Sequence, residues 1–235
     1  MVKIFDRNLF IMLIAIMIGA ITITYFIADI VNQSKIENLN FEHNTEIITI
    51  EERNINFTSI FLESLVLLDS SREDRAFGNY HFDIASLFYY RALIENDKSK
   101  MELYKNITID NCTKAMIKYF ISNQNFIRTS SIFNNSKKYT DFNNYLILID
   151  MYINLTKSGE RLTMLRYNSS KYLRQLAENL TYVNGSAMLG NVTDLLDLFN
   201  ESMMMYGEEL IIYEEIEETI DEYSIEGFSP KREPN

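Results

Sequence analysis

Eleven Asn-x-Ser/Thr triplets, the acceptor pattern for N-linked glycosylation, stand out among the residues of this 235-residue chain that could do chemistry. With 24 asparagines in the chain, random placement gives about three such triplets. A glycan is bulky, hydrated and attached outside the cytoplasm, so the segment that carries the triplets is expected to face the exterior. We predict modification at Asn32, Asn56, Asn106, Asn111, Asn134, Asn154, Asn168, Asn179, Asn184, Asn191 and Asn200.

Histidine and cysteine are too scarce to build a zinc site. The two histidines, His43 and His81, and the single cysteine, Cys112, cannot supply a Cys/His cage. His81 stands between Tyr80 and Phe82, and we interpret it as a hydrogen-bonded structural histidine rather than a ligand or general base. The chain contains no HExxH, Gly-rich phosphate loop or GxSxG pattern. We therefore predict no catalytic residue, no cofactor and no metal, and a protein that is not an enzyme.

Cys112 also excludes an internal disulfide, so an exterior domain must hold together by packing alone. The residue occupies the middle of the Asn111 triplet, where a glycan would shield it. We expect a buried or shielded thiol, with intermolecular pairing as the alternative. The composition is more typical of an archaeal surface protein than of an animal one. It combines many acceptor triplets with no disulfide framework, abundant Ile, Asn and Tyr, and no Trp.

Acidic residues give the chain a formal charge of −11 and a pI of about 4.7, which makes nucleic acid and anionic head groups poor partners. Near the end, Glu214, Glu217, Glu218 and Asp221 follow the spacing of one solvated helix face, which we prefer to a calcium site. The methionine run at residues 203–205 is interpreted as adaptable packing rather than copper binding.

The element that would place the triplets outside is an uncharged stretch at residues 9–28. Twenty residues in a helix span about 30 Å, the thickness of the hydrocarbon layer. We predict one membrane-spanning helix at residues 9–30, with a cleaved signal peptide as the alternative. Lys3 and Arg7 precede it, so the positive-inside bias leaves residues 1–8 in the cytoplasm and the rest of the chain outside the cell.

Within this stretch, Ala15 and Gly19 are four residues apart and share one helix face. Such a pair of small residues lets a second helix approach closely. We therefore assign both to helix packing, with a purely lipid-facing role as the alternative.

The remaining chain is predicted to be all-α. Helix breakers are nearly absent, since both prolines lie in the last six residues, and apolar residues recur at intervals of three and four. Clusters of turn-forming residues divide the chain into about six helices; they lie at residues 96–98, 133–138, 157–159 and 184–186. One helix is expected to begin near Asp110, and the last to cover residues 188–220. Residues 45–50 could form a strand because Ile47, Ile48 and Ile50 are β-branched, but no partner strand is evident, so we assign them to a helix or a juxtamembrane linker.

Helices without strands leave a bundle as the favoured architecture. Asn191 and Asn200 are nine residues apart and would fall on opposite sides of one helix, so we expect a break or a thinly covered helix there. We divide the chain into a cytoplasmic N-terminus (1–8), the membrane helix (9–30), a juxtamembrane linker or helix (31–55), the extracytoplasmic helical domain (56–223) and a flexible tail (224–235).

These elements favour a non-enzymatic, single-pass surface glycoprotein that binds another envelope protein or serves as an accessory subunit of a membrane assembly. The alternative is an extracytoplasmic small-ligand-binding or sensory module that works with a membrane partner. An apolar surface free of acceptor triplets would favour the first hypothesis. A pocket between helices with converging polar groups would favour the second.

Overall fold

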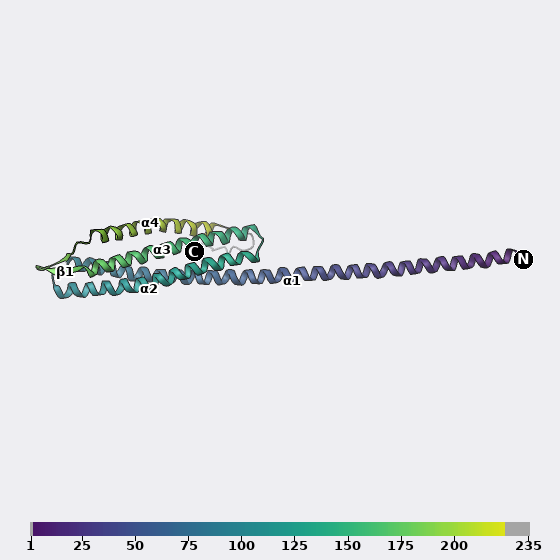
Figure 1. Cartoon of the computed structure of the whole chain (residues 1–235), viewed down its shortest axis with the longest axis horizontal. Helices are drawn as coiled ribbons and strands as arrows, with labels where there is room; N and C mark the ends of the chain where they lie inside the picture. Colours follow the sequence, from purple (N-terminus) through teal and green to yellow (C-terminus); the bar gives the residue numbers. More distant parts are fainter. Residues whose placement is uncertain (1, 224–235) are drawn as a thin grey trace, which may run out of the picture. The chain divides into compact units, whose positions relative to one another are not determined.

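The computed structural model describes the backbone of residues 2–223 and the side chains of residues 31–223, so the predicted tail at 224–235 lies outside the described residues. Two compact units divide the chain, Met1–Arg53 and Asn54–Asn235, and the first helix runs through both. The described elements are α1 (Val2–Ile94), α2 (Lys98–Ser136), the 3-10 turn η1 (Lys137–Tyr139), α3 (Asn143–Glu178), β1 (Leu180–Val183), β2 (Ser186–Leu189) and α4 (Thr193–Glu222) (Figure 1).

The backbone of the predicted membrane segment, residues 9–30, belongs to α1, but its side chains, with those of Ala15 and Gly19, lie outside the described part. Among the residues that the structure describes, no helix is both long and apolar enough to cross a bilayer. Residues 45–50 are helical, as one of the two interpretations held. The hydroxyl of Thr49 donates to the Thr45 carbonyl oxygen at 2.9 Å, one helical turn back.

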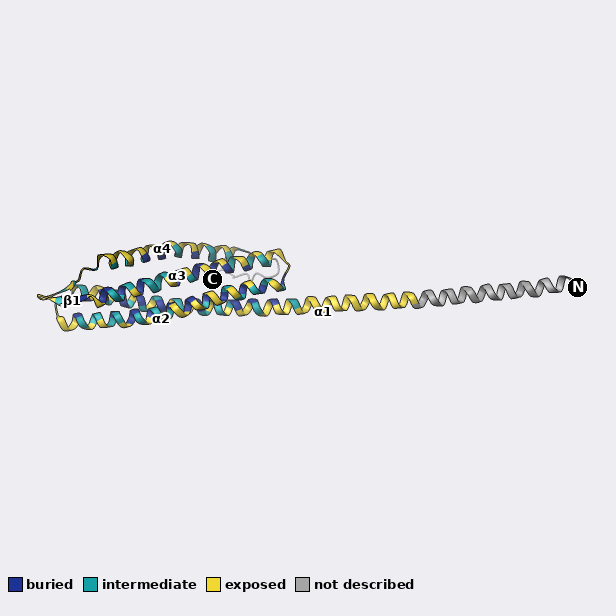
Figure 2. Ribbon diagram, in the orientation of Figure 1, coloured by how far each residue is buried: buried dark blue, intermediate teal, exposed yellow. Residues whose placement is uncertain are grey.

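In the second unit, the C-terminal part of α1 packs with α2, α3 and α4 into a four-helix bundle, with buried residues along the inner faces (Figure 2). The predicted helical bundle is confirmed. On α1 the buried positions repeat with the heptad spacing that packs one helix along another. They are residues Phe57, Phe61, Ser64, Leu68, Ser71, Gly78, Phe82, Ala85, Tyr89 and Ala92.

Three of the four predicted breaks are confirmed. The helix α1 ends at Ile94, and Asp97 caps α2 by accepting a hydrogen bond from the Lys100 amide at 3.0 Å. At the far end of α2 the helix stops at Ser136. Asn184 and Gly185 have φ of 52° and 89°, and two positive φ values in succession are typical of a tight hairpin turn.

The expected break at residues 157–159 is wrong, because Ser158 and Gly159 are buried inside α3. A Cβ on Gly159 would lie 2.5 Å from the Phe126 ring of α2. Glycine is therefore needed there for close approach of the two helices rather than for a turn. The expected helix start near Asp110 is also wrong, since α2 begins at Lys98. As a result, the described residues form four long helices instead of about six.

An antiparallel hairpin that we did not predict connects α3 to α4. Leu180 pairs with Leu189, and Met188, expected in the last helix, pairs with Thr181. The buried side chain of Leu180 packs with Ala92 and Met101 and closes this end of the core. The hairpin thus replaces the first residues of the expected helix, and α4 begins only at Thr193.

Buried hydroxyl groups line much of the interior, and most donate to their own helix. Ser71 donates to the Leu67 carbonyl oxygen at 2.7 Å, and Thr129 donates to the Asn125 carbonyl oxygen at 2.7 Å. Ser170 makes the same bond one turn back in α3. Small side chains whose polar atoms are already satisfied allow the helix backbones to approach closely.

Candidate functional site

The predicted glycan acceptors are distributed over the surface of both units. Nine of the eleven asparagines have exposed side chains and Asn168 is half-buried: the exposed ones are Asn32, Asn56, Asn106, Asn134, Asn154, Asn179, Asn184, Asn191 and Asn200. Their exposure makes the attachment of a bulky glycan compatible with the folded chain.

Three acceptors gather at the hairpin end of the bundle. Asn179 caps α3, Asn184 occupies the turn between the strands, and Asn191 follows β2. The Gly190 amide donates to the Asn179 carbonyl oxygen at 3.5 Å, which holds the two ends of the hairpin together. Asn191 precedes α4 and Asn200 lies on it, so the expected break between these two acceptors is confirmed.

Asn111 is the exception among the acceptors. Its side chain is only 9% exposed, and its Nδ2 donates to the Ile107 carbonyl oxygen at 2.9 Å. Its Oδ1 lies 3.1 Å from His81 Nδ1. His81 is therefore hydrogen-bonded, as we predicted. A glycan on the nitrogen of Asn111 does not fit this packing, so we expect this acceptor to stay unmodified in the folded protein.

The other candidate side chains lie apart from one another. Cys112 is buried as predicted, and burial raises the pKa of its thiol to about 12. Met203 packs against the core, whereas Met204 and Met205 are exposed. Glu217 pairs with Arg72 instead of facing solvent freely. Within residues 31–223, no group of three or more His, Cys, Asp or Glu side chains could hold a metal ion.

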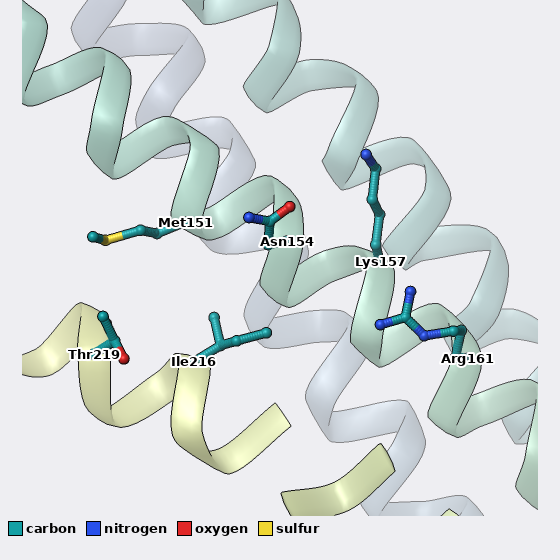
Figure 3. Close-up of a pocket in the computed structure, with 6 residues that line it drawn as sticks. All are labelled: Met151, Asn154, Lys157, Arg161, Ile216 and Thr219. Carbon is teal, nitrogen blue, oxygen red and sulfur yellow. The ribbon is translucent and has the colours of Figure 1, made fainter. Parts of the chain in front are cut away.

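An open groove of about 380 Å³ lies between α3 and α4, and sequence reasoning did not identify it. Three of its polar residues come from α3 with spacings of three and four: Asn154, Lys157 and Arg161 (Figure 3). Met151 of α3 and Ile216 and Thr219 of α4 complete the lining. The groove therefore combines two cationic side chains, one acceptor asparagine and an apolar wall.

Arg161 is not available as a free cation in this groove. Its guanidinium binds both carboxylate oxygens of Glu209, at 2.9 and 2.8 Å, and Ser158 donates to the same carboxylate at 2.5 Å. Partial burial alone would raise the pKa of Glu209, but the bonds from Arg161 and Ser158 lower it below its ordinary value. In the described structure, Lys157 supplies the remaining positive charge of the groove.

Only three residues of α4 are buried, Ser202, Tyr206 and Tyr213, so half-buried apolar side chains and polar contacts together hold this helix to the bundle. Ser202 donates to the Leu165 carbonyl oxygen at 2.8 Å, and the Tyr213 hydroxyl accepts a bond from Arg72 at 3.0 Å. The thin cover that we expected for this helix is confirmed. Arg75 and Arg166 also face α4, against the Tyr213 and Tyr206 rings, and sequence reasoning missed both.

Comparison with known proteins identified no relative. No protein family matches the chain, and no curated protein or solved structure is detectably similar to it. The function must therefore be inferred from the residues and their geometry.

Proposed function

We propose that this chain is a non-enzymatic, single-pass surface glycoprotein whose helical bundle binds another protein of the envelope or of a membrane assembly. The excess of acceptor triplets supports an exterior location for the bundle. The uncharged stretch at residues 9–28, preceded by Lys3 and Arg7, supports an anchor with its N-terminus in the cytoplasm.

The observation that carries the binding role is an apolar face on α1 without acceptor triplets. Phe77, Tyr80, Leu87 and Ile94 are 46%, 61%, 50% and 80% exposed. At 100° per residue they fall within an arc of about 100°, on the side opposite the buried heptad positions. No acceptor triplet begins between Asn56 and Asn106, so glycans would leave this face uncovered.

The shape of this face favours a helix of a partner protein. It extends over 18 residues of straight helix, or about 27 Å, and offers large side chains one or two turns apart. Exposed apolar residues gathered on one helix face mark interaction sites, and Arg91 is a charged residue within this arc. We therefore propose that a partner lays an apolar helix ridge along the α1 face and buries these four side chains.

Location and modification are tested together on intact cells. Externally added protease should cleave the bundle, and mass spectrometry should find carbohydrate on exposed acceptors such as Asn154 and Asn184. Full protection of the bundle, together with acceptors that are all unmodified, would exclude the exterior location. The partner experiment below does not depend on carbohydrate, so the two parts of the proposal can fail separately.

The binding face is tested by changing its charge without touching the core. Tyr80→Glu combined with Leu87→Glu should abolish the complex that co-purifies with the native protein from mild detergent. Met204→Glu is the matched control, because Met204 is also exposed, at 60%, but lies on α4. A complex that survives the α1 change, or that both changes disrupt equally, contradicts the assignment of this face.

A second candidate function, an extracytoplasmic small-ligand-binding or sensory module, is favoured by the α3–α4 groove. Its volume of about 380 Å³ lies within the range of 300–1,000 Å³ typical of ligand sites. If a small anion binds there, Lys157→Ala should abolish its effect on the thermal unfolding midpoint. An unchanged effect in this variant would remove the groove from consideration.

A further inference from the structure

Two arginines lie beneath α4 with their charged groups against aromatic rings. The Arg75 guanidinium of α1 lies 4.3 Å from the centre of the Tyr213 ring. The Arg166 guanidinium of α3 lies 3.8 Å from the Tyr206 ring and 4.6 Å from the Phe82 ring. These contacts attract a cation to the face of a ring, but they provide no acceptor for its N–H groups.

Both arginines keep a buried donor that no acceptor among the described residues satisfies. Arg75 Nη1 and Arg166 Nε are buried and make no hydrogen bond. A different nitrogen of Arg166, Nη1, donates to the Met203 sulfur at 3.3 Å, and a thioether sulfur is only a weak acceptor. Arg72 and Arg161, in contrast, pair with carboxylates. A buried charged donor without an acceptor is costly, and native proteins rarely retain one without a counterpart.

The two guanidinium groups act on the same part of the core. Burial raises the pKa of the Tyr119 hydroxyl, while the positive charges of Arg166 and Arg75 both oppose this rise. The same hydroxyl donates to Asn79 Oδ1 at 2.7 Å, one turn along α1 from Arg75. The rings that the two guanidinium groups face, Tyr206 and Tyr213, are seven residues, about two turns, apart on α4, in a chain whose formal net charge is −11.

We propose that Arg75 and Arg166 form a binding site for a small anion, a carboxylate or inorganic phosphate, between α4 and the pair α1 and α3. The guanidinium fork fits such anions because its parallel N–H groups bind two oxygens at once. The helix α4, with three buried residues, is the element that adjusts to admit the anion. This site is separate from the apolar face of α1 and independent of glycosylation.

The test uses the full chain in mild detergent, with sodium succinate and sodium phosphate as probes at constant ionic strength. The wild-type protein should show a saturable rise of its thermal unfolding midpoint with at least one probe, because an anion that binds only the folded state stabilises it. Amide hydrogen exchange in α4 should slow over the same concentration range. Absence of both effects with both probes overturns the proposal.

Variants distinguish an anion site from a structural role of the arginines. Arg75→Met and Arg166→Met should abolish the response yet keep or raise the midpoint in probe-free buffer, because each removes an unpaired buried charge. Arg128→Met is the control, since that side chain is 67% exposed, and it should respond like the wild type. If either variant fails to fold, Arg166→Lys should fold and bind the probe more weakly. A response that survives in all folded variants contradicts the site.

Discussion

The contact between Gly159 and Phe126 gives the sharpest prediction for the fold. A Cβ at position 159 would lie 2.5–2.8 Å from three atoms of the Phe126 ring, closer than carbon atoms normally pack. The ring is fully buried and cannot swing into solvent. Gly159→Ala should therefore force α2 and α3 apart, although alanine suits a helix better than glycine does.

The magnitude follows from two opposing effects. Overpacking a core costs about 1–3 kcal/mol, whereas replacing glycine by alanine in a helix gains about 1 kcal/mol. Because the contact is short and the ring is enclosed, we expect a net loss of about 1–2 kcal/mol. For a domain of this size each kcal/mol lowers the unfolding midpoint by about 2–4 °C.

Gly207 of α4 provides the matched control, since a Cβ there meets no atom within 4 Å. Gly207→Ala should stabilise the bundle by up to about 1 kcal/mol. Urea unfolding followed by circular dichroism measures both variants, and Phe126→Leu in the Gly159→Ala background should recover part of the loss. If Gly159→Ala is as stable as Gly207→Ala, close approach does not explain the glycine.

Three further predictions concern single side chains. Because Asn111 is buried, glycopeptide analysis should find it unmodified while Asn106, five residues earlier and exposed, carries sugar; full occupancy at Asn111 would contradict this. The lowered pKa of Glu209 contributes stability that is present at neutral pH and is lost as the pH falls below 4.5 through that pKa. The amide hydrogens of α4 should therefore exchange faster at such low pH. In the Glu209→Gln variant they should exchange fast at neutral pH as well. A pKa of about 12 instead of 9.0 lowers the thiolate fraction of Cys112 at pH 8 about a thousandfold. Iodoacetamide should therefore modify Cys112 in urea but not in the folded protein. Equal modification rates in the two states would show that the thiol is accessible.

The helical bundle follows from the apolar spacing because that signal averages over many residues. Single glycines carry less information, since the same residue type serves turns and close contacts. Gly185 forms the hairpin turn with a positive φ, whereas Gly159 lies mid-helix against an aromatic ring. The Asn184-Gly185 pair, with Thr181, Tyr182 and Val183 before it, was the available signal for the hairpin. We predicted only a break at this pair and not a hairpin, because apolar residues with helical spacing continue on both sides of it.

The candidate sites depended on contacts between distant residues, which spacing does not reveal. The α3–α4 groove requires that Lys157 and Ile216 come together across 59 positions of sequence. The burial of Asn111 likewise depends on His81 of the neighbouring helix. Position 75 was more informative, because an arginine within a heptad of buried residues already indicates a charged group in the core.

The buried serines and threonines decide how this bundle tolerates change. Since Ser71 and Thr129 return their protons to carbonyl groups of the same helix, they exert no directional pull on neighbouring helices. Steric interlocking helps to fix the axial placement of the helices, with the Tyr119 ring against Gly78 and the Phe126 ring against Gly159. A few hydroxyls between helices add to it, such as Ser122, which donates to the Ser71 carbonyl oxygen at 2.6 Å. Evolution can therefore exchange most interior hydroxyls for methyl groups at little cost, while these two ring-and-glycine pairs must vary together.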